Sequence, residues 1–410
     1  MKRIVAKLYY QSFVVIFIGL LLSSKFFWGL DFKLVSALIV WVGLYLLVKS
    51  NEGLNLRDFS KNGVRLYSLY LVTAVLWVTR SFFFDDNTKF TGTPILTIFG
   101  SLVFGVFLYI LPILFLFASP KMLPTIFKSL KLIVGLTAIG FILSADMIMK
   151  SVTPFSFKLA MASIFICPFV FYLKRSAKWF YLAFLFVMIF IFEIVDERAA
   201  IMYWSLCLLG FIGVTQKLPK TVWGISMITG CIIVISVLVY SLYYGISIFQ
   251  VLSELYSDKS DIVNDTRSFI FYELSGDLSR NKCWLFGKGI LGTCYSPYFD
   301  MSMSGNGDSA YRLGLEVGFL QYMLKGGLFF VSLFMLTMLM AMYNAFFKSK
   351  NSFLKMVGVL ILANYVLSCV SQGPMMDLRN FYLWIMMGCC FCKPIIEMTD
   401  RDLDLLLKLQ

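Results

Sequence analysis

The strongest constraint on the fold of this chain is a series of apolar runs long enough to cross a lipid bilayer. A membrane-spanning helix needs about 17–25 predominantly apolar residues. The charged triplet Asp196-Glu197-Arg198 separates two runs that would otherwise form one very long helix. We therefore predict an all-α transmembrane bundle of about twelve spans, over residues 9–28, 33–48, 64–84, 94–118, 126–147, 157–173, 179–195, 199–214, 222–246, 316–346, 353–370 and 378–392.

The composition favours a lipid environment over a soluble core. The chain is 60% apolar and 14% charged, whereas soluble domains average about 45–50% and about 25%. A helix in lipid satisfies its own backbone hydrogen bonds, so long apolar runs are tolerated there. We expect the run after Met1-Lys2-Arg3 to be a retained first span, because no small-residue cleavage site follows it.

The net charge of +13 is better explained by membrane topology than by nucleic acid. Lys and Arg cluster between the apolar runs, as the positive-inside bias requires, and no basic stripe is interleaved with aromatic residues. With the N-terminus inside, the inner segments hold 21 Lys and Arg, and the outer side holds 8 apart from the long loop and the helix after it. We predict cytoplasmic termini, nine spans over 1–246, a large outer loop over 247–315, and three spans with a tail over 316–410.

Cysteine and charge patterns narrow the chemistry. Cys389 and Cys392 form a CxxC inside an apolar run, and the chain has no His, so we expect no metal site and no cofactor. Cys283 and Cys294 fall in the outer loop and could pair in an oxidising compartment, although their spacing does not decide it. No ionisable residue lies firmly mid-span, which argues against an ion-coupled pump.

Arg residues gather where the predicted spans meet the outer side. A guanidinium grips phosphate with a planar fork of donors, so Arg is favoured over Lys at phosphate sites. The alternative use of each is as an interfacial anchor that reaches the headgroups. The candidates are Arg80, Arg198 and Arg379 at span ends, and Arg267, Arg280 and Arg312 in the loop.

The outer loop has an internal order of its own. Residues 268–280 have the apolar pattern of an amphipathic helix, with Asp265 or Thr266 as its N-cap. A glycine-punctuated segment over 284–292 follows, which is either a weak phosphate-loop signal or a tight turn beside the membrane. A second helix is then expected to re-enter the bilayer through Tyr311, Arg312, Glu316 and Gln321, and to reach Lys325-Gly326-Gly327.

This order of features resembles the O-antigen polymerase and O-antigen ligase superfamily of bacterial envelope enzymes. The matching elements are Asp196-Glu197-Arg198-Ala199-Ala200, Asp265-Thr266-Arg267, Leu285-Phe286-Gly287-Lys288-Gly289-Ile290 and Leu324-Lys325-Gly326-Gly327-Leu328. The resemblance implies a helical fold like that of membrane glycosyltransferases that use lipid-linked sugars. It also implies a polyprenyl-diphosphate-linked glycan as donor, with Arg198 and Arg267 at the positions that engage its diphosphate.

The chain departs from this family at one position. Ligases of the family carry a His about eleven residues before the closing Gly, where this chain has Glu316. A carboxylate can accept the proton of the acceptor hydroxyl if partial burial raises its pKa. Glu316 is therefore the expected base, with Asp308 and Glu273 as reserves. Alternatively, Glu316 forms a structural ion pair with Arg312, four residues earlier on one helical face.

The missing His shifts the expected function from ligase to polymerase. We expect a polymerase of undecaprenyl-diphosphate-linked repeat units, for O-antigen or capsular polysaccharide, on the outer face of the bacterial inner membrane. The alternatives are a ligase that transfers the glycan to lipid A core, a flippase of the lipid-linked unit, and a non-enzymatic scaffold. The expected partners are membrane lipids, the lipid-linked glycan, and a chain-length regulator or other envelope-assembly proteins.

Overall fold

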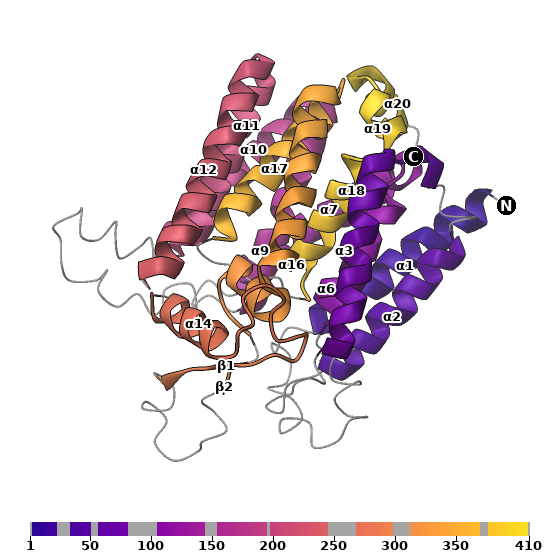
Figure 1. The fold of residues 1–410 in the computed structure, drawn as a ribbon. Coiled ribbons are helices and arrows are strands. Elements are labelled where there is room, and N and C mark those ends of the chain that lie inside the picture. Colours follow the sequence, from indigo (N-terminus) through magenta and orange to yellow (C-terminus); the bar gives the residue numbers. More distant parts are fainter. Residues whose placement is uncertain are drawn as a thin grey trace.

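The computed structural model describes residues 2–22, 33–50, 56–80, 105–143, 154–194, 197–244, 268–297, 311–312, 314–369 and 376–408. These residues form a bundle of helices (Figure 1). In the first half of the chain the helices are α1 (Lys2–Leu22), α2 (Lys33–Ser50), η1 (Leu56–Asp58), α3 (Lys61–Arg80), α6 (Val106–Ile113), η3 (Leu114–Phe117), η4 (Pro120–Met122), α7 (Leu123–Leu143), α9 (Pro154–Ser163), η5 (Ile164–Tyr172), α10 (Arg175–Ile194) and α11 (Arg198–Thr215).

The second half adds the elements on which the candidate site is built. They are α12 (Lys220–Tyr244), α14 (Ser268–Arg280), β1 (Cys294–Tyr295), β2 (Tyr311–Arg312), α16 (Gly318–Tyr343), the π-helical turn η7 (Asn344–Lys348), α17 (Ser352–Leu367), α18 (Leu378–Cys389), α19 (Lys393–Glu397) and α20 (Asp400–Lys408). The fold is all-α, as predicted, apart from one small ribbon in which β1 and β2 pair antiparallel with Cys294 opposite Arg312.

Four described helices are long and apolar enough to cross a membrane: Pro120–Ile142, Arg175–Ile194, Lys220–Tyr244 and Gly318–Lys348. Each of the twelve apolar runs found in the sequence contains a helix, and six of these helices are apolar but shorter. The number of twelve spans therefore stays a prediction.

The helix α12 shows why these helices belong in lipid. Only four of its residues are buried, namely Trp223, Gly230, Val234 and Ser241. Most of its large apolar side chains face outward; Ile225, for example, is 65% exposed. Soluble proteins rarely expose apolar patches of this extent, so the outward side chains are matched to acyl chains rather than to water.

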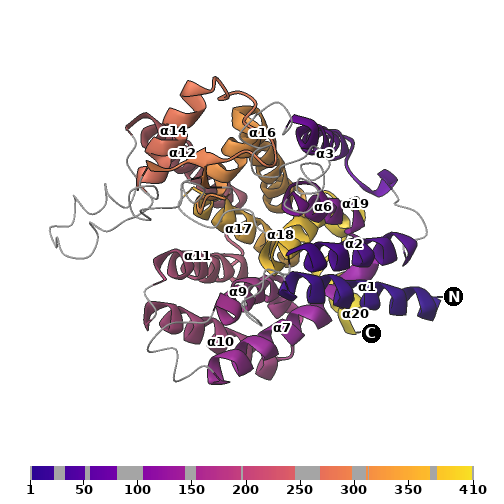
Figure 2. The same cartoon turned by 90° about the horizontal axis from the view of Figure 1, so that it is seen from below.

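The helices α17 and α18 form the centre of the bundle. Figure 2 shows both surrounded by other helices, and all twelve residues of α18 are buried. A helix that is apolar all round is stable only where neighbours cover every face. The side chains of Asn351 and Asp377 start the two helices as N-caps, by accepting hydrogen bonds from the backbone of Leu354 and Asn380.

The charged triplet that divides the seventh and eighth runs does end a helix. The helix α10 stops at Ile194 and α11 begins at Arg198. The backbone N–H of Glu197 donates to the carbonyl of Phe192 at 3.0 Å. The predicted break between these two helices is confirmed.

The two ends of the bundle carry different structures. The helix α14 and the ribbon lie at one end, and α19, α20 and the two chain termini lie toward the other (Figure 1). At that second end the Lys220 ammonium donates to the Phe347 carbonyl at 2.8 Å. Segments that the charge pattern assigns to one side of the membrane therefore do lie together, and the orientation of that side stays a prediction.

Candidate functional site

The two glycine-containing elements of the sequence pattern lie backbone against backbone. The turn over 284–289 and the segment 324–329 of α16 are joined by four backbone hydrogen bonds of 2.8–3.1 Å. We call this paired structure the glycine clasp. Its bonds run from Lys288 N–H to the Leu324 carbonyl, Gly289 to Lys325, Leu328 to Trp284, and Phe329 to Leu285.

Two glycines make this approach possible. Gly287 has φ +58° and Gly327 has φ +67°, a region that other residues enter only with strain. A Cβ on Gly287 would lie 2.6 Å from the backbone nitrogens of Gly326 and Gly327. Gly327 also breaks α16 into two arms, since its ψ of −168° is not helical. The segment over 284–289 is therefore a tight turn that packs against α16.

The C-terminal end of α3 fastens the glycine clasp to the bundle. The Trp77 indole N–H donates to the Phe286 carbonyl at 2.8 Å. The Arg80 Nε donates to the Gly287 carbonyl at 2.8 Å, and its guanidinium lies 5.8 Å from the centre of the Phe286 ring. Arg80, which the sequence predicts to bind phosphate, thus positions the turn through its Nε–H group.

A buried polar cluster lies between α14 and the glycine clasp. Asp277 of α14 forms an ion pair with Lys288 at 2.6 Å, and both side chains are nearly inaccessible. Lys288 also donates to the Thr293 carbonyl at 3.0 Å. The ammonium of Lys325, which is 2% exposed, donates to the Gly292 carbonyl at 2.8 Å. These contacts hold α14 against the clasp. Removing one partner of the Asp277–Lys288 pair would leave the other as an uncompensated buried charge.

Glu273 lies on the same buried face of α14, one turn before Asp277. It is 7% exposed and accepts a hydrogen bond from the Ser296 hydroxyl at 2.9 Å. The predicted amphipathic helix is therefore confirmed, and its inner face carries two carboxylates as well as Leu274 and Leu278. As a reserve base, Glu273 is buried but already engaged.

The ribbon holds Arg312 near this cluster. Arg312 pairs with Cys294 through the β1–β2 register, and its guanidinium lies 5.4 Å from the centre of the Phe269 ring of α14. Arg280, at the end of α14, is exposed and donates from Nε to the Gly276 carbonyl of its own helix. Of these two predicted phosphate ligands, only Arg312 lies against the cluster.

Both loop cysteines are free thiols. Cys283 donates to the Asn281 carbonyl at 3.0 Å, and both sulfur-bearing side chains are buried. Burial raises the pKa of Cys283, and burial together with the nearby Asp277 charge raises the pKa of Cys294 to about 12. Neither thiol is therefore an activated nucleophile, because the thiolate is the reactive form.

Arg379 occupies a buried position at the start of α18. It is 4% exposed and lies within electrostatic range of the hydroxyls of Tyr322, in α16, and Tyr203, in α11. Tyr203 is five residues after the start of α11 at Arg198. Aromatic rings connect this region to the glycine clasp, since Tyr322 contacts Phe330 and Phe330 stacks on Trp77.

The expected geometry around Glu316 is wrong in two respects. Glu316 is exposed, whereas the general-base hypothesis required it to be partly buried. It also shares no helical face with Arg312, because Arg312 belongs to β2 and α16 begins only at Gly318. The Gln321 side chain accepts a hydrogen bond from the Leu315 N–H at 2.8 Å and so satisfies the backbone just before this start.

Several predicted residues lie outside what the structure describes. They are Arg267, Asp308, the capping residues Asp265 and Thr266, and the side chain of Arg198, whose backbone begins α11. Sequence reasoning in turn missed Asp277, Lys288 and Lys325. Two features of the sequence could have pointed to them. Asp277 follows Glu273 by four residues, which places both on one helical face, and each Lys stands next to a glycine.

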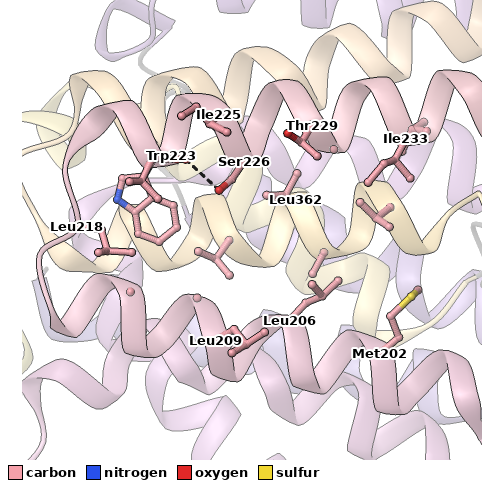
Figure 3. Close-up of a pocket in the computed structure, with 18 of the residues that line it drawn as sticks. Met202, Leu206, Leu209, Leu218, Trp223, Ile225, Ser226, Thr229, Ile233 and Leu362 are labelled. Atoms are coloured by element: carbon pink, nitrogen blue, oxygen red, sulfur yellow. Dashed lines mark hydrogen bonds between the residues drawn. The ribbon is translucent and has the colours of Figure 1, made fainter.

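A long apolar groove runs between α11, α12 and α17 (Figure 3). Its volume is about 630 Å³. The lining residues of α12 extend from Val222 to Val237, which corresponds to roughly 22 Å at ~1.5 Å per residue. Gly210 and Gly230 allow α17 to approach, since Cβ atoms there would collide with Val359 and Leu362.

One end of this apolar groove reaches the α14 end of the bundle. Cys369 lines the groove, and the neighbouring carbonyl of Ser368 accepts a hydrogen bond from the Phe319 N–H in the first turn of α16 at 3.0 Å. The other end lies at Leu218 and Trp223, as Figure 3 shows. The groove has the shape and polarity of a binding site for an extended hydrocarbon chain.

Among the described residues, no group of three or more Cys, Asp and Glu side chains is placed to hold a metal ion. Comparison of the chain with protein-family models, with curated proteins and with solved structures gives no match.

Proposed function

We propose that the protein is a membrane polymerase that joins oligosaccharide repeat units carried on undecaprenyl diphosphate. The observation that supports the proposal is the apolar groove between α11, α12 and α17, which has a volume of about 630 Å³ and reaches Cys369 at the α14 end of the bundle. Arg198 and Arg379 belong to the first turns of α11 and α18. Helix N-termini and guanidinium groups are both donors that suit a diphosphate.

The reaction is a glycosyl transfer. The hydroxyl of an acceptor sugar forms a bond to the anomeric carbon of the donor unit, while the bond between that carbon and the diphosphate oxygen breaks. The leaving diphosphate takes the electron pair, and Arg198, Arg267 and Arg379 stabilise its growing charge. The hydroxyl proton passes to a carboxylate, for which Asp308 is the remaining candidate of the sequence.

The apolar groove supports a lipid-linked donor. Its roughly 22 Å length, at ~1.5 Å per residue of α12, covers most of a hydrocarbon core that is about 30 Å thick. A prenyl chain lying in this groove would bring its diphosphate toward Cys369 and the first turn of α16. The substrate would then be delivered to the end of the bundle that carries the Arg residues and α14.

The proposal is tested with purified protein in proteoliposomes supplied with a synthetic undecaprenyl-diphosphate-linked repeat unit. We expect glycan ladders and release of undecaprenyl diphosphate. Arg198→Ala and Arg267→Ala are each expected to lower the rate about 10²-fold or more, as loss of a preorganised donor does. Arg65→Ala, on the exposed face of α3, is the matched control and should leave the rate unchanged.

Normal polymerisation by both Arg variants would refute the role of these residues. Transfer of the glycan to lipid A core without elongation would identify a ligase instead. Movement of the unit across the membrane with no new glycosidic bond would identify a flippase.

A further inference from the structure

A second pocket, which is polar, lies at the end of the bundle opposite α14. Its volume is about 560 Å³. Five segments that are distant in sequence form its wall: the end of η5, the start of α10, the end of α11, the start of α17 and the helix α20. The charged residues that line it are Lys174, Lys178, Lys217, Asp400, Arg401, Asp404 and Lys408.

The two carboxylates of the pocket are already engaged by the protein. Asp400 accepts hydrogen bonds from the Tyr172 hydroxyl at 2.6 Å and from the backbone and hydroxyl of Ser352 at 2.7 and 3.0 Å. Asp404 forms an ion pair with Lys408 at 2.5 Å. Asp400 therefore docks α20, Asp404 is paired within α20, and the remaining charges of the pocket are left unbalanced.

Four cations of the pocket have no carboxylate paired with them among the described residues. They are Lys174, Lys178, Lys217 and Arg401. Asp402, the neighbour of Arg401, accepts hydrogen bonds from the backbone and hydroxyl of Thr399; these bonds and, to a lesser extent, the Arg401 charge lower the pKa of Asp402. Four positive groups, two at the start of α10, one after α11 and one in α20, thus surround one concave volume, an arrangement that suits a phosphate group.

Exposed aromatic residues lie beside the pocket. Trp179 is 64% exposed and Phe180 is 59% exposed, directly after Lys178. Exposed aromatic residues of this kind sit at the headgroup level of a bilayer. Further along α10 the outward residues are apolar, for example Phe190 at 66% exposure. A phosphate bound among the four cations would therefore lie where lipid headgroups lie.

The short helix α20 closes one side of this pocket. Leu403 is buried in the bundle, while Asp402 accepts from Thr399 at the helix start. Arg401 thereby stands on the pocket side of a helix that the Asp400 contacts hold in place. The wall formed by the C-terminal segment is thus built into the fold.

We propose that this pocket binds the phosphate of an anionic phospholipid from the adjacent leaflet. Lys174, Lys178, Lys217 and Arg401 supply the positive charge, and Trp179 and Phe180 set the depth of the lipid. The pocket lies away from the proposed glycan chemistry, so its test does not depend on the polymerase proposal.

The experiment measures lipid retention by the purified full-length protein with native mass spectrometry, after exchange into equimolar dioleoyl phosphatidylglycerol and dioleoyl phosphatidylcholine. We expect preferential retention of phosphatidylglycerol. The double variant Lys174→Gln/Arg401→Gln should lose this preference, by about fivefold for each cation removed. The matched control Lys49→Gln/Lys61→Gln removes the same charge from exposed positions on the same side and should keep it.

Three results would overturn the proposal. One is equal retention of the two lipids by the wild-type protein. Another is the same loss of preference in the control pair, which would indicate general attraction to a basic surface. The third is displacement of phosphatidylglycerol by millimolar inorganic phosphate, which would assign the pocket to a soluble phosphate-bearing ligand.

Discussion

Gly287 and Gly327 pack so closely that a Cβ on Gly287 would lie 2.6 Å from the Gly327 nitrogen. The two residues are forty positions apart in sequence, yet their segments share four backbone hydrogen bonds. This contact joins the turn over residues 284–289 to α16 at the point where Gly327 interrupts that helix. The relative position of α14 and the bundle therefore depends on two residues without side chains.

Alanine at either glycine is expected to destabilise the clasp. The positive φ alone costs roughly 1–2 kcal/mol for a residue with a Cβ, and the backbone contacts at 2.4–2.7 Å add to this cost. Gly276→Ala, a helical position of α14 with nothing within 4 Å, is the control and should be neutral or slightly stabilising. The midpoint of thermal unfolding and the rate of limited proteolysis within residues 247–315 are compared for the three variants and the wild-type protein. Equal stability of all three variants would contradict the packing.

The Asp277–Lys288 ion pair gives a second prediction. Lys288→Met leaves Asp277 charged and buried, so we expect a loss of about 3–5 kcal/mol in stability. Asp277→Asn combined with Lys288→Met removes both charges and should recover much of that loss. A double variant no more stable than Lys288→Met would show that the charge pair is not what locks α14 to the clasp.

Cys294 provides a pH-dependent prediction. Burial and the Asp277 charge raise its pKa to about 12, so the thiol stays protonated through the neutral range. Because the thiolate is the nucleophile, labelling by a maleimide should be very slow at pH 8 and should accelerate only as the pH approaches 12 or after unfolding. Rapid labelling of Cys294 in the folded protein at pH 7 would contradict the burial of this strand.

Blocking the apolar groove should impair only donors with long lipid chains. Thr229 lines the groove, whereas Ile228 is 58% exposed and lies outside it. We expect Thr229→Trp to slow elongation with an undecaprenyl donor and to spare a donor with a short prenyl chain. Ile228→Trp should affect neither donor, and an equal effect of the two tryptophans would exclude the groove as the prenyl site.

The sequence predicts those features that depend on local pattern. The break at Asp196-Glu197-Arg198, the amphipathic helix 268–280 and the tight turn near Gly287 all follow from charge, apolar period or glycine placement. The burial of Lys288 and Lys325 does not follow, because backbone pairing between distant segments leaves no periodic signal. The helix start at Gly318 was missed because Tyr311 and Arg312 pair with β1, which overrides the helical pattern expected there.

The proposed glycosyl transfer at the α14 end requires that this end faces away from the cytoplasm. Single cysteines at Tyr272, which is 72% exposed on α14, and at Leu405, which is 51% exposed on α20, report the two ends. The native cysteines are buried except Cys231, which is partly buried, so wild-type protein is the background control. In intact spheroplasts, a membrane-impermeant maleimide should label Tyr272→Cys and not Leu405→Cys. Labelling of Leu405→Cys alone would contradict the proposed function.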